Sequence, residues 1–132
     1  MKHFINKRGK VYAYALNGSQ DNYIKEGLKP ISDAELIILR RPTAEEAEAT
    51  RIEAIKQAAG DLILSSYPAH KQANMLAEVL QLINKRITST LTSKDEATLA
   101  SMQSAWDWIK SVRVKSNQAE DDGTEVADIV WP

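Results

Sequence analysis

Three segments with the spacing of a helix-capping box constrain the fold of this chain more than any other feature. They are Ser32-Asp33-Ala34-Glu35, Thr43-Ala44-Glu45-Glu46 and Ser93-Lys94-Asp95-Glu96. In a capping box, the Ser/Thr side chain and the Glu side chain each satisfy a free backbone N–H at a helix start. The boxes predict helices over about residues 33–40, 43–66 and 93–118. A further helix, over about 69–87, follows the break at Tyr67-Pro68, because proline stops the helix before it.

The apolar residues of these predicted helices recur with helical spacing. The helix over 43–66 carries the stripe Ile52, Ile55, Ala59, Leu62 and Ile63. The helix over 69–87 has the clearest amphipathic pattern, with one face made of Leu76, Val79, Leu80, Ile83 and Ile87. Such stripes face a core, and that core is predicted to be aliphatic because aromatic residues make up only 6% of the chain. We expect residues 43–118 to form a helical hairpin or a three-helix bundle.

The first 42 residues have a different pattern. Residues 2–5 and 11–16 are β-prone, and Asn6-Lys7-Arg8-Gly9 between them has turn chemistry, which predicts a β-hairpin. Tyr23-Ile24 is a candidate third strand. The predicted fold is therefore mainly α with a small N-terminal β-hairpin, an α+β protein. We expect a hairpin module with a short helix at 1–42, a helical hairpin or bundle at 43–118, and an acidic, mobile tail with an apolar end at 119–132.

Charge is small overall but uneven along the chain. The net charge of −1 argues against general electrostatic binding of nucleic acid. Residues 1–42 hold 8 Lys/Arg and 4 Asp/Glu, whereas residues 117–132 hold 5 acidic residues and no basic one. A solvated surface accounts for this asymmetry, but a positive head and a negative tail can also attract each other within one chain or in a homo-oligomer.

The chain contains no cysteine, which excludes disulfides and thiolate chemistry. Its start meets charged residues after two apolar ones, unlike a secretory signal, and no run of about 18 apolar residues predicts a membrane span. We expect a protein that stays in the cytoplasm where it is made, or enters an assembly there.

No motif predicts an enzyme, a cofactor or a metal site. His3 and His70 lie in different predicted elements without a metal-spaced neighbour, and there is no nucleophile elbow or glycine-rich phosphate loop. The acidic residues Glu45, Glu46, Glu48 and Glu53 have the pattern of a solvated helix start. We therefore predict no catalytic, cofactor-binding or metal-binding residues, and a protein that acts by binding another protein.

The last predicted helix places its two tryptophans on different faces. Leu99, Met102, Trp106 and Ile109 form one stripe, and Trp108 lies about 200° around the helix from Trp106. Trp108 shares its face with Ala97, Ser101, Ser104 and Val112, a strip that the N-terminal hairpin, the Trp131 tail or another chain could cover. Since aromatic residues are enriched at binding surfaces, the predicted partner-binding residues are Tyr12, Tyr14, Trp108, Val112 and Trp131.

Several segments resemble small tailed-phage proteins encoded beside tail-fibre genes, which are described as tail-fibre assembly proteins. The N-terminal segments are Met1-Lys2-His3-Phe4-Ile5-Asn6, Val11-Tyr12-Ala13-Tyr14, Tyr23-Ile24-Lys25-Glu26-Gly27-Leu28, Ile31-Ser32-Asp33-Ala34-Glu35 and Pro42. The later ones are similar to helical segments of phage tail-associated proteins: Tyr67-Pro68-Ala69-His70-Lys71-Gln72-Ala73-Asn74-Met75, the run from Trp106 to Ile109, Val112-Arg113 and Ser116-Asn117.

The resemblance implies a chaperone that binds a fibre subunit or another tail protein and helps it to trimerise or mature. It would work in the host cytoplasm during assembly, and some family members remain on the virion tail. Fibre chains expose apolar surface and strand edges before they trimerise, so a protein that covers them would suppress misassembly. The alternative is a structural virion component, a tail or baseplate adaptor that stays in the particle.

Overall fold

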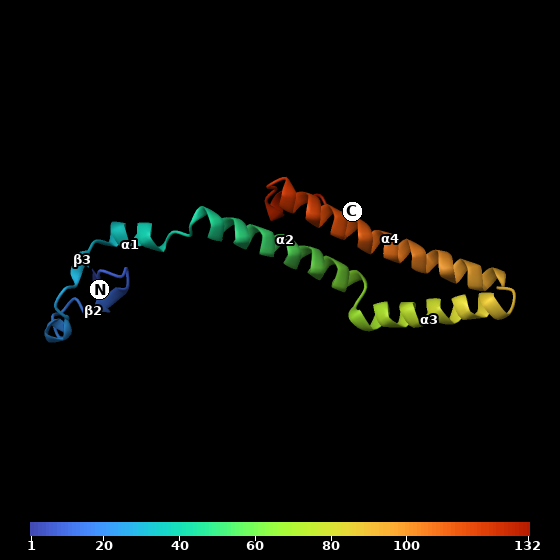
Figure 1. Cartoon of the computed structure of the whole chain (residues 1–132), viewed down its shortest axis with the longest axis horizontal. Helices are drawn as coiled ribbons and strands as arrows, with labels where there is room; N and C mark the ends of the chain where they lie inside the picture. The colour runs from blue at the N-terminus through green and yellow to red at the C-terminus, as the bar shows by residue number, and fades with distance from the viewer. The chain divides into compact units, whose positions relative to one another are not determined.

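The computed structural model describes all residues from 1 to 132 and is mainly helical, with a small antiparallel sheet at the N-terminus (Figure 1). The α+β fold class predicted from the sequence is confirmed. The chain divides into two units, Met1–Ala44 and Glu45–Pro132. The predicted tail region, 119–132, belongs to the second unit.

The first unit contains three strands where the sequence predicted a hairpin with a candidate third strand. These are β1 (Lys2–Ile5), β2 (Val11–Tyr14) and β3 (Lys29–Ile31), antiparallel and in the order β2-β1-β3. The turn between β1 and β2 needs Gly9, whose φ is 79°. The prediction of a third strand at Tyr23-Ile24 was wrong. Tyr23 ends a 3₁₀ helix, Asp21–Tyr23, and β3 contains Pro30, which an edge strand tolerates.

Helix α1 (Asp33–Arg40) follows the sheet directly and starts at the predicted capping box. The Glu35 N–H donates to Ser32 Oγ at 3.2 Å, and the Ser32 N–H donates to the Glu35 carboxylate at 2.8 Å. The Ser32 hydroxyl also donates to the Glu35 carboxylate, at 2.7 Å, and this hydrogen bond together with that from the Ser32 N–H lowers the pKa of the Glu35 carboxyl. His3 Nδ1 of β1 lies 3.3 Å from Asp33 Oδ1 at the start of α1. Leu36 is the one buried apolar residue of the first unit.

The second unit is a helical hairpin whose first arm is broken in two. That arm consists of α2 (Ala44–Ser66) and α3 (Ala69–Thr88), and the returning arm is α4 (Ser93–Asp121). Helix α2 packs against the C-terminal half of α4 and α3 lies along the N-terminal half (Figure 1). Of the two predicted arrangements, a helical hairpin and a three-helix bundle, the structure shows the hairpin. The break at Pro68 separates α2 from α3 but does not turn α3 back onto α2. No helix combines the length and apolar character of a membrane span.

The core lies along one seam of α4. Its buried residues are spaced alternately three and four apart, as in a coiled coil: Met102, Ala105, Ile109, Val112, Ser116 and Ala119. Helix α2 contributes Ile55, Ala59 and Ile63. The predicted stripe contained Met102 and Ile109, but the structure places Ala105 and not Trp106 at its centre. Helix α4 is capped one residue earlier than predicted, by Thr92 and Asp95, and ends at Asp121.

Candidate protein-binding surfaces

The two predicted contact residues of the sheet are both half-buried by their own unit. Tyr14 packs edge-on against Phe4, with ring centroids 5.6 Å apart, and its hydroxyl donates to the Tyr23 carbonyl at 3.3 Å. The Tyr12 hydroxyl accepts from Asn6 Nδ2 at 3.5 Å. Both tyrosines therefore stabilise the sheet, and only part of each ring is open to a partner.

The three predicted contact residues of the second unit lie together at the tail. Trp108 packs against Tyr67, with ring centroids 5.7 Å apart, and its Nε1–H donates to the Pro132 carbonyl at 3.3 Å. Trp131 is half-buried against the core, and Val112 is 0% exposed. Of the three covers left open for the Trp108 face, the structure shows the tail. Val112 offers no surface to a partner in this conformation, because its position on α4 lies in the seam facing α2.

The tail is held in place at the end of α4, where the sequence predicted an acidic, mobile segment. The Thr124 N–H donates to the Ala119 carbonyl at 3.0 Å, and Gly123 has a φ of 71°. This is the Schellman arrangement that ends many helices. A 3₁₀ helix, Val126–Asp128, then brings Ile129 against Ile55, where it is 8% exposed. The apolar end predicted for the tail is thus part of the core.

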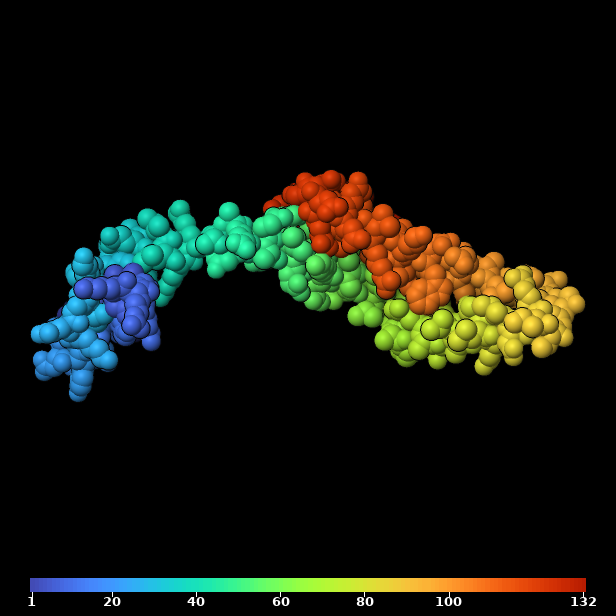
Figure 2. Space-filling model, in the orientation of Figure 1, coloured from blue at the N-terminus to red at the C-terminus, as the bar shows by residue number.

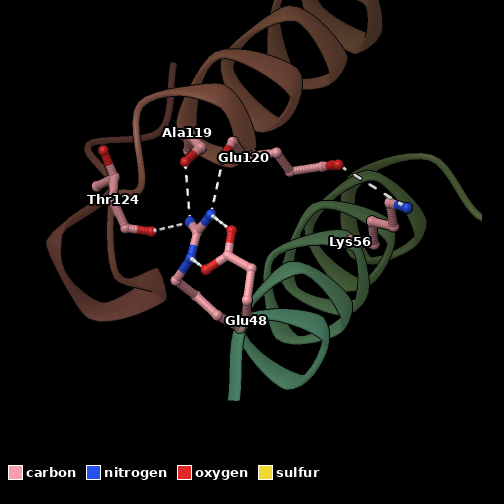
Figure 3. A network of polar contacts seen from close by, with 6 residues as sticks. Glu48, Lys56, Ala119, Glu120 and Thr124 are labelled. Atoms are coloured by element: carbon pink, nitrogen blue, oxygen red, sulfur yellow. Dashed lines mark hydrogen bonds and ion pairs between the residues drawn. The ribbon is translucent and has the colours of Figure 1, made fainter. Parts of the chain in front are cut away.

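A buried arginine joins α2 to this tail (Figure 3). Arg51 Nη1 donates to the carbonyls of Ala119 at 3.0 Å and Thr124 at 2.7 Å, and Nη2 donates to Glu120 at 2.8 Å. Glu48 accepts the remaining two hydrogen bonds, so all five donors of the guanidinium are used. The hydrogen-bonded Glu48 carboxylate raises the pKa of Arg51, and Arg51 lowers the pKa of Glu48. A cation is also favoured here by the dipole of α4, whose C-terminal carbonyls it meets.

The largest exposed apolar row of the second unit lies on α3. Leu76, Leu80, Ile83 and Ile87 are 52%, 59%, 46% and 78% exposed, and we call them the α3 stripe. Their spacing of four, three and four residues is that of a coiled-coil seam. The positions on one side of the stripe, Ala73, Ala77 and Asn84, carry no charge. Figure 2 shows α3 at an edge of the second unit, next to the first half of α4. The α3 stripe is therefore a surface suited to another apolar segment.

The α3 stripe faces outward because other residues hold α3 against α4. Leu82 is buried, and Lys85 Nζ lies 2.5 Å from Asp95 Oδ2 on α4. Arg86 makes a longer ion pair with Glu96 at 3.5 Å. Asp95 also accepts from the Thr92 N–H at 2.8 Å, so it caps α4 and binds α3 at once. Lys85 and these capping bonds lower the pKa of Asp95 to about 2.

Sequence reasoning named the residues of the α3 stripe but assigned them to the core. Of the five residues on the predicted apolar face, only Val79 is half-buried, and the other four are exposed. The five residues span an arc of about 100°, the ordinary width of a stripe that faces a core, so their spacing gave no sign of exposure. Helix α4 instead lies on the side of Leu82, a buried residue outside the predicted face.

The remaining polar side chains do not gather into a metal centre. No group of three or more His, Cys, Asp or Glu side chains is placed to hold a metal ion. His3 pairs with Asp33, and His70 is exposed in the first turn of α3. Comparison with known proteins gives no match to a protein-family model, a curated protein or a solved structure.

Proposed function

We propose that this protein is a non-enzymatic binding factor that acts as an assembly chaperone for phage tail fibres and holds the fibre subunit through the α3 stripe. Two independent considerations support the proposal. The N-terminal segments resemble tail-fibre assembly proteins and the later ones resemble phage tail-associated proteins. The second unit, in turn, leaves a row of large aliphatic side chains exposed. The exposed α3 stripe is the observation that carries the proposal.

The size of the α3 stripe suits reversible binding. Each of its four side chains is about half exposed or more. Burying one large aliphatic side chain fully is worth about 1.5–3 kcal/mol, so covering the stripe would contribute roughly 5 kcal/mol. Association itself costs about 4–15 kcal/mol. The stripe alone therefore supports weak binding, and a client that later buries the same apolar surface in its own trimer would be released.

The client fits the stripe by its chemistry. A fibre chain that has not yet trimerised exposes apolar segments. The four-three-four spacing of the α3 stripe matches a helical or extended segment with apolar side chains at similar intervals. On one side of the stripe Ala73, Ala77 and Asn84 carry no charge, and on the other Arg86 is paired with Glu96, so the flanks place little net charge against a client. The place of action would be the host cytoplasm, before the fibre is attached to the particle.

Co-expression with the fibre subunit encoded beside this protein tests the proposal. The Leu80→Ser, Ile83→Ser double variant removes the centre of the stripe without touching a buried residue. Asn74→Ser with Gln81→Ser serves as the control, because it changes exposed polar positions of the same helix outside the stripe. We expect soluble fibre trimer with the wild-type and control proteins, and a loss of about tenfold or more with the stripe variant.

Equal trimer yields with and without this protein, together with no co-purification, would contradict the chaperone proposal. Mass spectrometry of purified particles separates it from the structural alternative. Absence of the protein from the particle fits a chaperone, whereas stoichiometric copies there would identify a tail or baseplate adaptor.

A further inference from the structure

Helix α1 carries a second exposed apolar surface, in the first unit. Ile37, Ile38 and Leu39 follow one another and are 59%, 62% and 54% exposed, while Leu36 alone faces inward. A short surface helix ordinarily exposes polar side chains on its outer side. Three exposed apolar residues in a row are unfavourable in water and are expected only where they serve a function. Arg40 and Arg41 follow immediately and are also exposed.

The first unit also carries uncompensated positive charge. It holds 8 Lys/Arg and 4 Asp/Glu. Two of the four carboxylates are already engaged: Asp21 pairs with Lys2 at 2.8 Å, and Glu35 accepts hydrogen bonds in the α1 cap. Seven of the eight basic side chains take part in no ion pair: Lys7, Arg8, Lys10, Lys25, Lys29, Arg40 and Arg41. The unit therefore presents cations that only a partner can neutralise.

We propose that the first unit binds an acidic protein segment that also carries aliphatic side chains, with α1 as the centre of the contact. Ile37 and Ile38 would bury the aliphatic side chains. Arg40 and Arg41 would pair with the carboxylates, for which the guanidinium has the matching two-pronged geometry. The surface, the unit and the partner differ from those of the α3 stripe, so this inference stands apart from the fibre proposal.

The exposed residues favour protein over nucleic acid as the partner. Single-stranded nucleic acid is bound by cations together with aromatic rings on which the bases stack. The exposed patch on α1 is aliphatic, and the rings of Tyr12 and Tyr14 are half-buried and used within the sheet. Tyr23 is 74% exposed, but it lies outside α1, in the 3₁₀ helix Asp21–Tyr23. Aliphatic side chains gain nothing from a phosphate backbone, whereas they are well matched to an amphipathic acidic segment.

Fluorescence anisotropy with a designed probe tests the inference on the full chain. The probe is a labelled peptide of about 15 residues with leucines on one helical face and glutamates elsewhere. Matched peptides replace every Glu by Gln or every Leu by Ser, and a single-stranded DNA oligonucleotide of similar length is the fourth ligand. We expect the acidic leucine peptide to bind at least about tenfold more tightly than any of the other three.

Four variants locate the site. Arg40→Glu with Arg41→Glu should raise the Kd of the acidic leucine peptide at least about tenfold, and Ile38→Ser should also weaken binding. Lys110→Glu with Arg113→Glu makes the same change in net charge on the exposed side of α4 and should leave the Kd within about twofold. Leu80→Ser should leave it unchanged as well, which separates this surface from the α3 stripe.

Each other outcome overturns the inference in a distinct way. Tighter binding of the oligonucleotide would make the first unit a nucleic-acid module, and equal binding of the serine peptide would leave only unspecific charge attraction. Equal weakening by the α4 charge variant would place the contact elsewhere. Self-association that is lost in the Arg40→Glu, Arg41→Glu protein would make a second copy the occupant. No binding of the acidic leucine peptide at millimolar concentration would remove the site altogether.

Discussion

Helices α2 and α3 lie along the same α4, yet only α2 has its apolar face closed. Against α2, the tail supplies a third element, so that Ile55 meets both Ala119 and Ile129. Against α3 there is no third element, and the four residues of the α3 stripe stay exposed. The half of the hairpin formed by α2, the tail and the second half of α4 therefore has a closed core, and the half formed by α3 and the first half of α4 leaves the α3 stripe exposed.

Replacing a core residue should give the largest difference in stability between the closed and the open half. Ile109, 1% exposed, lies in the closed half. We expect Ile109→Ala to lower the free energy of unfolding by about 2–5 kcal/mol, because the side chain leaves a cavity that the helices cannot close. Leu80→Ala in the open half should change it by no more than about 0.5 kcal/mol. Urea denaturation followed by circular dichroism measures both, and similar losses would contradict the division into a closed and an open half.

Removal of the tail should open the closed half. Deleting residues 124–132 exposes the surface that Ile129 and Trp131 cover and takes away one carbonyl partner of Arg51. We expect a loss of about 3 kcal/mol, from one aliphatic side chain and part of a tryptophan. The truncated protein should also bind more of the dye ANS than the full chain does. Unchanged stability after truncation would mean that the tail does not close the core in solution.

Substitution of Arg51 should weaken the same closure by a smaller amount than loss of the whole tail. Arg51→Met keeps the length of the side chain but removes the hydrogen bonds to three carbonyls, and the Ala119 and Glu120 carbonyls then keep only their backbone donors. Arg51→Lys should not restore stability, because one ammonium group cannot reproduce the two-pronged contact. Lys56→Met is the matched control, since Lys56 is exposed and lies 3.8 Å from Glu120. Thermal unfolding compares the midpoints, and a lysine variant as stable as wild type would refute the multidentate role of Arg51.

Acid should act on the open half through Asp95. Its pKa is lowered from 3.8 to about 2 by Lys85 and the α4 cap. Its contribution to stability is therefore complete above pH 3.8 and is lost as the pH falls toward about 2. The difference in unfolding free energy between wild type and Asp95→Asn should be constant at neutral pH and shrink in that acidic range. A difference that is independent of pH would show that Asp95 is not paired in solution.

Local signals were enough to predict most of the helices. Ser32 and Glu35 form the predicted box, and Pro68 breaks the chain where expected, because caps and proline act within a few residues. The third strand was missed because β3 is defined by its pairing with β1. Arg51 was missed for the same reason, since its carbonyl partners lie 68 to 73 residues away along the chain.

The candidate site was only partly predictable. The apolar residues of α3 were found from their spacing, but their exposure depends on which side of the helix α4 occupies, and α4 lies on the side of Leu82 and Lys85. Trp108 was predicted as a contact residue with the tail as one of three possible covers, and the structure shows it half-buried, with its Nε1–H donating to the Pro132 carbonyl. Spacing along one helix gives the direction of each side chain, but what lies against it is decided by the rest of the fold.

Sedimentation velocity of purified protein mixed with the neighbouring fibre subunit tests the central claim most directly. We expect a complex with the wild-type protein and with the Asn74→Ser, Gln81→Ser control. The Leu80→Ser, Ile83→Ser protein, with unchanged stability, should bind at least about tenfold more weakly. A stripe variant that binds the fibre subunit as tightly as wild type would contradict the account.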